Sequence, residues 1–131
     1  MFLSELTPLQ RAGFAILVHE IVHADGRLAV EEEAILSRLN AEGGIQADPV
    51  IMSFENALAA FAATEHRRAA MIELIGVCWS DGILADKEAA VLDRIADAWA
   101  IEPQVRFDMI DWVKRQTALF AEACTLIGVE G

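Results

Sequence analysis

The chain carries the stretch IVHADGRLAVEEEAILSRL at residues 21–39, and its pattern returns at residues 77–95 as VCWSDGILADKEAAVLDRI. The two stretches align without a gap at an offset of 56 residues, and eight of their nineteen positions are identical. In each copy an Asp-Gly pair separates two segments that have the apolar spacing of a helix. We therefore predict one helix–turn–helix unit that is used twice. Two such units commonly pack about a pseudo-twofold axis and cover each other's apolar faces.

The rest of the sequence also predicts helices. Thr7-Pro8 is typical of an N-cap followed by Pro at the first helical position. The expected helices cover about residues 8–24, 30–41, 48–63, 64–79 and 86–99, followed by a long segment over 103–127 that can break in two. The first helix is apolar nearly all round, so we expect it to be central. No segment alternates with a period of two, so the prediction is an all-α, compact bundle of about six or seven helices in a single domain over residues 1–131.

The composition excludes several classes of protein. The chain has 131 residues, a formal net charge of −11 and 55% hydrophobic residues. Such an acidic chain is a poor partner for nucleic acid, whereas a divalent cation or a basic protein surface is compatible with it. The apolar runs are too short for membrane insertion, and the N-terminus lacks a basic region typical of a signal peptide, which favours a cytoplasmic protein. Cys78 and Cys124 are far apart in sequence, and we expect them to be buried, reduced thiols.

Each acidic turn matches the second half of an EF-hand loop. The Asp, the Gly, the following Leu and the Glu would occupy loop positions 5, 6, 8 and 12. The first half fails in both copies, because the positions of the first two ligands hold Ile21 and His23 in one copy and Val77 and Trp79 in the other. A complete EF-hand is therefore excluded.

Pairing the two copies would combine their half-sites. The combined site would contain Asp25, Glu32, Asp81 and Glu88, and four carboxylates suit a hard cation such as Ca²⁺ or Mg²⁺. The alternative is purely structural. An Asp in a tight turn accepts backbone hydrogen bonds, and a Glu in the first turn of a helix favours the helix dipole and can reach back to the cap.

A second motif overlaps the first copy. Residues His19-Glu20-Ile21-Val22-His23 have the HExxH pattern of zinc proteases, in which two His bind Zn²⁺ and the Glu is the general base. Proteases of this type bind substrate along an exposed strand, and the sequence predicts no strand. The second copy also lacks the motif. We therefore expect a non-enzymatic protein, and we keep His19 and His23 as an alternative metal site, with Zn²⁺ as a less favoured cation than Ca²⁺ or Mg²⁺.

The three tryptophans, Trp79, Trp99 and Trp112, are expected to be core or interface anchors. The basic run His66-Arg67-Arg68 carries little functional information. The sequence contains no Gly-rich phosphate loop and no nucleophile elbow.

The repeated turn, Ala24-Asp25-Gly26 with Glu32 and Ser80-Asp81-Gly82 with Glu88, resembles the TerB-like tellurite-resistance family of bacteria. The resemblance covers roughly residues 9–127 and rests on the double occurrence of a short motif. It implies a compact all-α bundle and a cytoplasmic stress-response protein linked to tellurite. It also implies metal binding at the acidic turns and docking to a protein partner that is associated with membranes. The chain departs from the family's pattern before each Glu, where it has Ala29-Val30 and Ala85-Asp86 instead of Ser or Thr followed by Pro.

Overall fold

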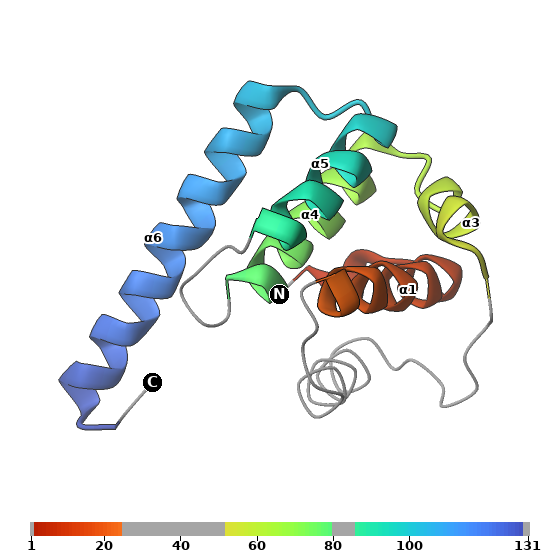
Figure 1. Ribbon diagram of the computed structural model, residues 1–131. Helices are drawn as coiled ribbons and strands as arrows, with labels where there is room; N and C mark the ends of the chain where they lie inside the picture. The colour runs from red at the N-terminus through yellow and green to blue at the C-terminus, as the bar shows by residue number, and fades with distance from the viewer. Residues whose placement is uncertain (1, 25–51, 80–85, 130–131) are drawn as a thin grey trace.

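The computed structural model describes residues 2–24, 52–79 and 86–129 (Figure 1). Over these ranges the chain is helical and has no strand, which confirms the all-α class. The elements in chain order are η1 (Leu3–Glu5), α1 (Pro8–Ala24), α3 (Phe54–Ala59), α4 (Thr64–Cys78), α5 (Asp86–Ala98) and α6 (Pro103–Ile127). The helix expected over about residues 30–41 lies outside the described residues. The expected six or seven helices and the repeat as a whole therefore stay predictions.

Helix α1 is central, as its all-round apolar pattern predicts. Its start is a reciprocal capping box, in which the Gln10 amide donates to Thr7 Oγ1 at 3.2 Å and the Thr7 amide donates to Gln10 Oε1 at 3.0 Å. Pro8 fits this first turn because its missing N–H needs no partner there. The helix packs against α3, α4 and α5. Its fully buried side chains are Phe14, Leu17, Val18, Ile21 and Val22.

Helix α3 is shorter than the segment expected over residues 48–63. It begins after Ser53, whose hydroxyl accepts a hydrogen bond from the Asn56 amide at 3.1 Å, and it ends at Ala59. The chain leaves the helix before Phe61, whose fully buried ring lies 4.9 Å from the ring of Trp99. Tertiary packing of Phe61 therefore accompanies the early end of α3. Thr is a residue type that favours the N-cap, so the sequence predicts that Thr64 caps the fourth helix. This prediction is wrong, because α4 begins at Thr64 and its N-cap is Ala63.

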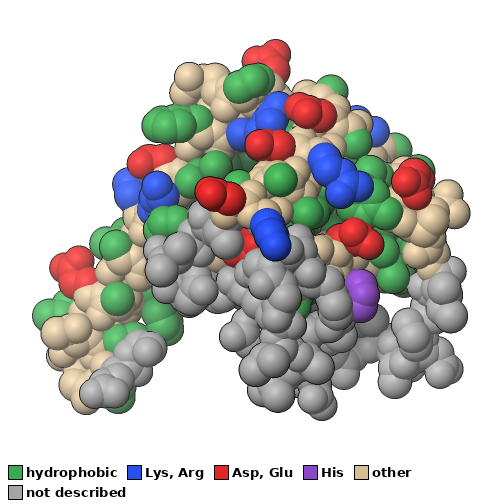
Figure 2. Space-filling model, in the orientation of Figure 1, with side chains coloured by type: hydrophobic (Ala, Val, Ile, Leu, Met, Phe, Trp, Pro, Cys, Tyr) green, Lys and Arg blue, Asp and Glu red, His purple; other side chains and the backbone are tan. Residues whose placement is uncertain are grey.

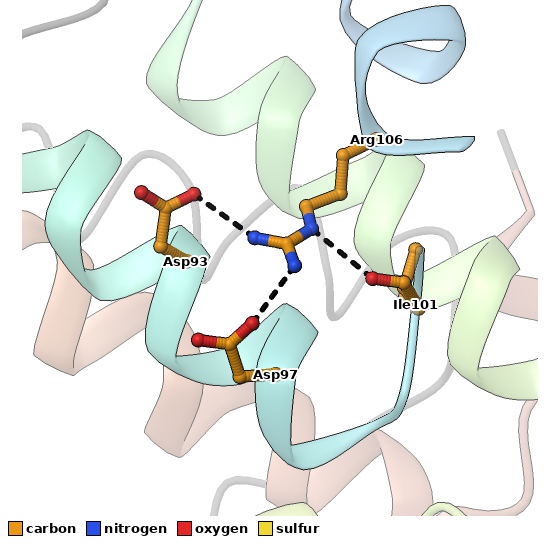
Figure 3. Close-up of polar contacts among 4 residues, drawn as sticks. All are labelled: Asp93, Asp97, Ile101 and Arg106. Carbon is orange, nitrogen blue, oxygen red and sulfur yellow. Dashed lines mark hydrogen bonds and ion pairs between the residues drawn. The ribbon is translucent and has the colours of Figure 1, made fainter. Parts of the chain in front are cut away.

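The guanidinium group of Arg106 joins α6 to α5 and to the loop between them (Figure 3). Arg106 Nε donates to the Ile101 carbonyl at 3.1 Å, and its two terminal nitrogens reach Asp93 at 3.3 Å and Asp97 at 2.8 Å. Ala100 has a φ of 56°, in the left-handed region that lets the chain turn between the helices. Arg106 thus joins the first turn of α6 to the loop before it and to the exposed face of α5.

Helix α6 runs unbroken from Pro103 to Ile127, so the break considered from the sequence does not occur. It ends in a Schellman motif: Gly128 has a φ of 82°, its amide donates to the Thr125 carbonyl at 3.2 Å, and the Val129 amide donates to the Cys124 carbonyl at 2.9 Å. In Figure 1 the C-terminal half of α6 extends past α4 and α5. No helix in the described ranges is long and apolar enough to cross a membrane.

The tryptophans and cysteines are buried or half-buried, as the sequence predicts for core anchors and buried thiols. Trp99 is buried, and its indole N–H donates to the Leu58 carbonyl at 3.0 Å. Trp79 and Trp112 are half-buried at the edge of the core. Cys78 and Cys124 are both buried as thiols rather than joined in a disulfide.

Candidate functional site

The candidate site lies at the two acidic turns. Three of its four predicted residues, Asp25, Glu32 and Asp81, lie outside the described residues, so the distances between the four carboxylates lie outside them as well. Glu88 is described, and it stands at the third position of α5. The structure therefore bears on the site through Glu88, through α1, which leads into the first turn, and through α4 and α5, which lie on either side of the second.

Glu88 is fully buried, with 0% of its surface exposed. It begins the apolar stripe of α5, which continues through Val91, Leu92 and Ile95 at the spacing of one helix face. By contrast, Asp86 and Lys87 in the same first turn are exposed. Glu88 therefore differs from an ordinary solvated charge at a helix start, because the geometry of α5 directs its carboxylate into the core.

A buried carboxylate needs compensation. Removing an ionised carboxyl group from water costs several kcal/mol unless hydrogen bonds or an opposite charge replace its hydration. Backbone amides at the start of α5 can supply part of this, since the N-terminus of a helix favours negative charge. A full capping box would also need a hydroxyl at the N-cap, and the residue that precedes α5 in the sequence is Ala85. A divalent cation is a further partner that would complement the negative charge of this carboxylate.

The three described helices that adjoin the two turns pack together. Helix α1 leads directly into the first acidic stretch, while α4 and α5 flank the second. Helix α1 contacts both α4 and α5. The first helix of one copy therefore packs against both helices of the other. Residues Ile21 and Val22 of α1 and their equivalents in α4, Val77 and Cys78, are all buried.

The HExxH residues lie in the last part of α1. His19 is exposed and Glu20 is half-buried, and the side chain of His23 lies outside the described part of the structure. Over residues 2–24, 52–79 and 86–129, no group of three or more His, Cys, Asp or Glu side chains could hold a metal ion. His19 therefore lies on the solvent-facing side of α1.

A second buried acid, Glu73 in α4, was not singled out from the sequence. Its side chain is 6% exposed, and its Oε1 accepts a hydrogen bond from the Phe2 amide at 2.6 Å. The sequence signal for it is a charged residue within a run of apolar positions, with Ala70 and Met71 before it and Leu74 and Ile75 after it. Glu73 binds the N-terminal segment to α4, which is a structural role.

Comparison of the chain with protein-family models, with curated proteins and with solved structures gave no match. The TerB-like resemblance therefore rests on the repeated turn and the all-α fold.

Proposed function

We propose that the chain is a non-enzymatic, TerB-like stress-response module of the cytoplasm. In this proposal it binds a divalent cation, Ca²⁺ or Mg²⁺, through Asp25, Glu32, Asp81 and Glu88. Cation binding would prepare a surface that docks a protein partner associated with a membrane. The observation that carries the proposal is the full burial of Glu88 at the start of α5.

The burial of Glu88 favours a cation over a purely structural acid. A Glu that only complements a helix dipole gains a few tenths to about 1 kcal/mol and can do so from the surface. Glu88 instead occupies the core-facing stripe of α5, where its carboxylate is removed from water. The position is also the last ligand of the EF-hand pattern, which in a complete loop is the bidentate Glu.

The packing of α1 against α4 and α5 supports pairing of the two turns. Gln10 and His66 are 56 residues apart, so they are equivalent positions of the repeat. Their side chains are in contact, with Gln10 Nε2 3.0 Å from His66 Nδ1. Equivalent residues touch when a twofold axis passes between the helices that carry them. Such an arrangement would bring the two half-sites to the same side of the bundle.

Titration calorimetry and thermal unfolding of the full chain with Ca²⁺, Mg²⁺ and Zn²⁺ test the proposal. Ca²⁺ or Mg²⁺ at 100 times its dissociation constant should stabilise the native chain by about 2.7 kcal/mol. The Glu88→Gln variant, which keeps the shape of the side chain, should lose this stabilisation. The matched control is Asp86→Asn, which removes an exposed carboxylate two residues away and should respond to the cation like the unmodified chain.

Two results would overturn the cation site. One is the absence of stabilisation by either Ca²⁺ or Mg²⁺. The other is an equal response to the cation in Glu88→Gln and in the unmodified chain, which would leave the acidic turns as helix caps. Stabilisation by Zn²⁺ alone, removed by His19→Ala, would move the metal site to the HExxH segment.

A further inference from the structure

The side chain of Gln10 joins three helices at one point. Its Oε1 accepts a hydrogen bond from the Thr7 amide at 3.0 Å, as part of the cap of α1. Its Nε2 donates to the carbonyl of Ala60, the C-cap residue of α3, at 3.3 Å. The same nitrogen lies 3.0 Å from Nδ1 of His66, in the first turn of α4. Gln10 is only 6% exposed, so these contacts replace the hydration of its amide group. We call Gln10 and these three partners the Gln10 joint.

The two backbone partners fix the orientation of the Gln10 amide group. A backbone N–H only donates and a backbone carbonyl only accepts, so the amide oxygen faces Thr7 and the amide nitrogen faces Ala60. The nitrogen carries two hydrogens, one for the Ala60 carbonyl and one for His66. Nδ1 of His66 therefore accepts this hydrogen bond. An imidazole nitrogen accepts only when it carries no proton, so the Gln10 joint requires a neutral His66 with its proton on Nε2.

The position of His66 in α4 also favours the neutral ring. His66 is the third residue of α4, where the positive end of the helix dipole disfavours a cation. Among the described residues, no carboxylate forms an ion pair with His66. Its neighbour Glu65 is exposed, and the Arg67 guanidinium donates to the carbonyls of Phe61 and Trp99.

Charged groups on the elements that contact α4 are directed elsewhere. Arg11 of α1 donates to the Ser4 carbonyl at 3.3 Å, and Glu5 of η1 is exposed. Arg106 of α6 pairs with two aspartates of α5. On the face of the molecule drawn in Figure 2, acidic and basic side chains of the described residues are interspersed rather than gathered by sign. The contact with Gln10 is therefore the interaction that distinguishes neutral from protonated His66.

We propose that His66 is a proton-sensitive switch at the Gln10 joint, in which a proton bound to Nδ1 breaks the contact between α1 and the first turn of α4. Protonation would set an N–H of His66 against an N–H of Gln10. The Gln10 amide cannot turn over in response, because the reversed amide would lose its hydrogen bonds to both Thr7 and Ala60. An imidazole changes its charge between about pH 5 and pH 8. The joint is intact above this range and is lost as the pH falls through it, with or without the proposed cation site.

Nuclear magnetic resonance of the full, isotope-labelled chain tests the switch. At about pH 8 the imidazole of His66 should carry its proton on Nε2 and none on Nδ1. Between about pH 8 and pH 5.5 the side-chain NH₂ resonances of Gln10 should shift with the same midpoint as the ring resonances of His66. The proposal is overturned by a neutral His66 that carries its proton on Nδ1, or by Gln10 resonances that do not follow the titration.

Variants convert the switch into a change of stability, measured by urea unfolding over the same pH range. His66→Asn offers an amide oxygen near the place of Nδ1 and does not titrate. Compared with His66→Asn, the unmodified chain should lose about three- to tenfold in its ratio of folded to unfolded molecules as the pH falls. This loss is the effect of one hydrogen bond.

Gln10→Glu should reverse the sign of this effect. The Glu keeps the acceptor for the Thr7 amide but offers His66 a second acceptor instead of a donor, so a proton on His66 gains a partner. In this background the chain with His66 should become more stable than the chain with His66→Asn as the pH falls. Gln104→Glu, the same exchange at an exposed position of α6, is the matched control and should keep the sign of the unmodified chain. Equal pH dependence with and without His66→Asn, or an unchanged sign in Gln10→Glu, would contradict the switch.

Discussion

The side-chain amide of Gln10 lies 3.0 Å from Nδ1 of His66, and the two residues are separated by the 56 positions that relate the two copies of the acidic turn. Gln10 is also the residue that closes the capping box of α1. The Gln10 side chain therefore caps the first turn of α1 and also joins α1 to the first turn of α4. A change at Gln10 should affect the N-terminal turns of both helices.

We expect the Gln10–His66 pair to show thermodynamic coupling. Gln10→Ala should lower the free energy of unfolding by about 2 kcal/mol, because it removes a cap and a partly buried hydrogen bond. His66→Ala should lower it by about 1 kcal/mol. A double-mutant cycle measured by urea unfolding should give a coupling energy of about 0.5–1 kcal/mol. Thr7→Ala combined with His66→Ala is the control and should be additive, because Thr7 belongs to the cap alone.

Two helical glycines should respond to alanine in opposite directions. A Cβ at Gly76 in α4 meets nothing within 4 Å, so Gly76→Ala should stabilise the fold by about 0.5–1 kcal/mol through helix propensity. A Cβ at Gly13 in α1 would lie 3.1 Å from the backbone carbonyl oxygen of Ala57, where α3 approaches α1. Gly13→Ala should therefore destabilise the fold. Equal effects of both substitutions on the midpoint of chemical unfolding would contradict the close approach of α1 and α3.

The hydrogen bond of Trp99 can be separated from its packing. Trp99→Phe keeps an aromatic ring near Phe61 but removes one of the two donors to the Leu58 carbonyl, which keeps its hydrogen bond from the Phe61 amide at 3.2 Å. We expect a loss of about 0.5–1.5 kcal/mol in the free energy of unfolding. Trp79→Phe is the matched substitution at a half-buried position and should cost less. A larger loss for Trp79→Phe would contradict the role of Trp99 as the core anchor.

The ion pairs of Arg106 should contribute less than its hydrogen bond to the Ile101 carbonyl. Asp93 and Asp97 are well exposed, so water and salt screen their attraction to the guanidinium. Asp93→Asn should change the free energy of unfolding by less than about 0.5 kcal/mol, whereas Arg106→Ala should cost about 1 kcal/mol. The effect of Arg106→Ala should persist at 1 M NaCl, measured by thermal unfolding. Its disappearance at that salt concentration would show that the ion pairs dominate.

Local signals made α1, α5 and α6 predictable. Thr7-Pro8 followed by Gln10 specifies the start of α1 within four residues, and the structure begins the helix at Pro8. Glu102-Pro103 does the same for α6. The buried face of α1 followed directly from its apolar spacing. These features depend on residues within one or two turns of each other, which is the range that a sequence pattern reports.

Features set by contacts between distant residues were not predictable. Helix α3 ends at Ala59, and Phe61 packs on Trp99, 38 positions away. Glu73 is buried because the N-terminal segment covers it and Phe2 donates to it, 71 positions away. The sequence identified Glu88 as a candidate ligand from the repeat. Its burial is consistent with the spacing of Val91 and Leu92, but the sequence alone predicts Glu88 as a helix cap or a metal ligand and does not place it in the core.

The backbone amides of α6 fall into two groups that should exchange hydrogen with solvent at different rates. The part near Met109 packs on the core, so its amide protons can exchange with solvent only when much of the domain opens. Beyond Gln116 most side chains of α6 are exposed, so the amides there should exchange mainly through fraying from the C-terminal end, which the Schellman motif at Gly128 slows. Hydrogen exchange measured residue by residue would show where along α6 one regime gives way to the other.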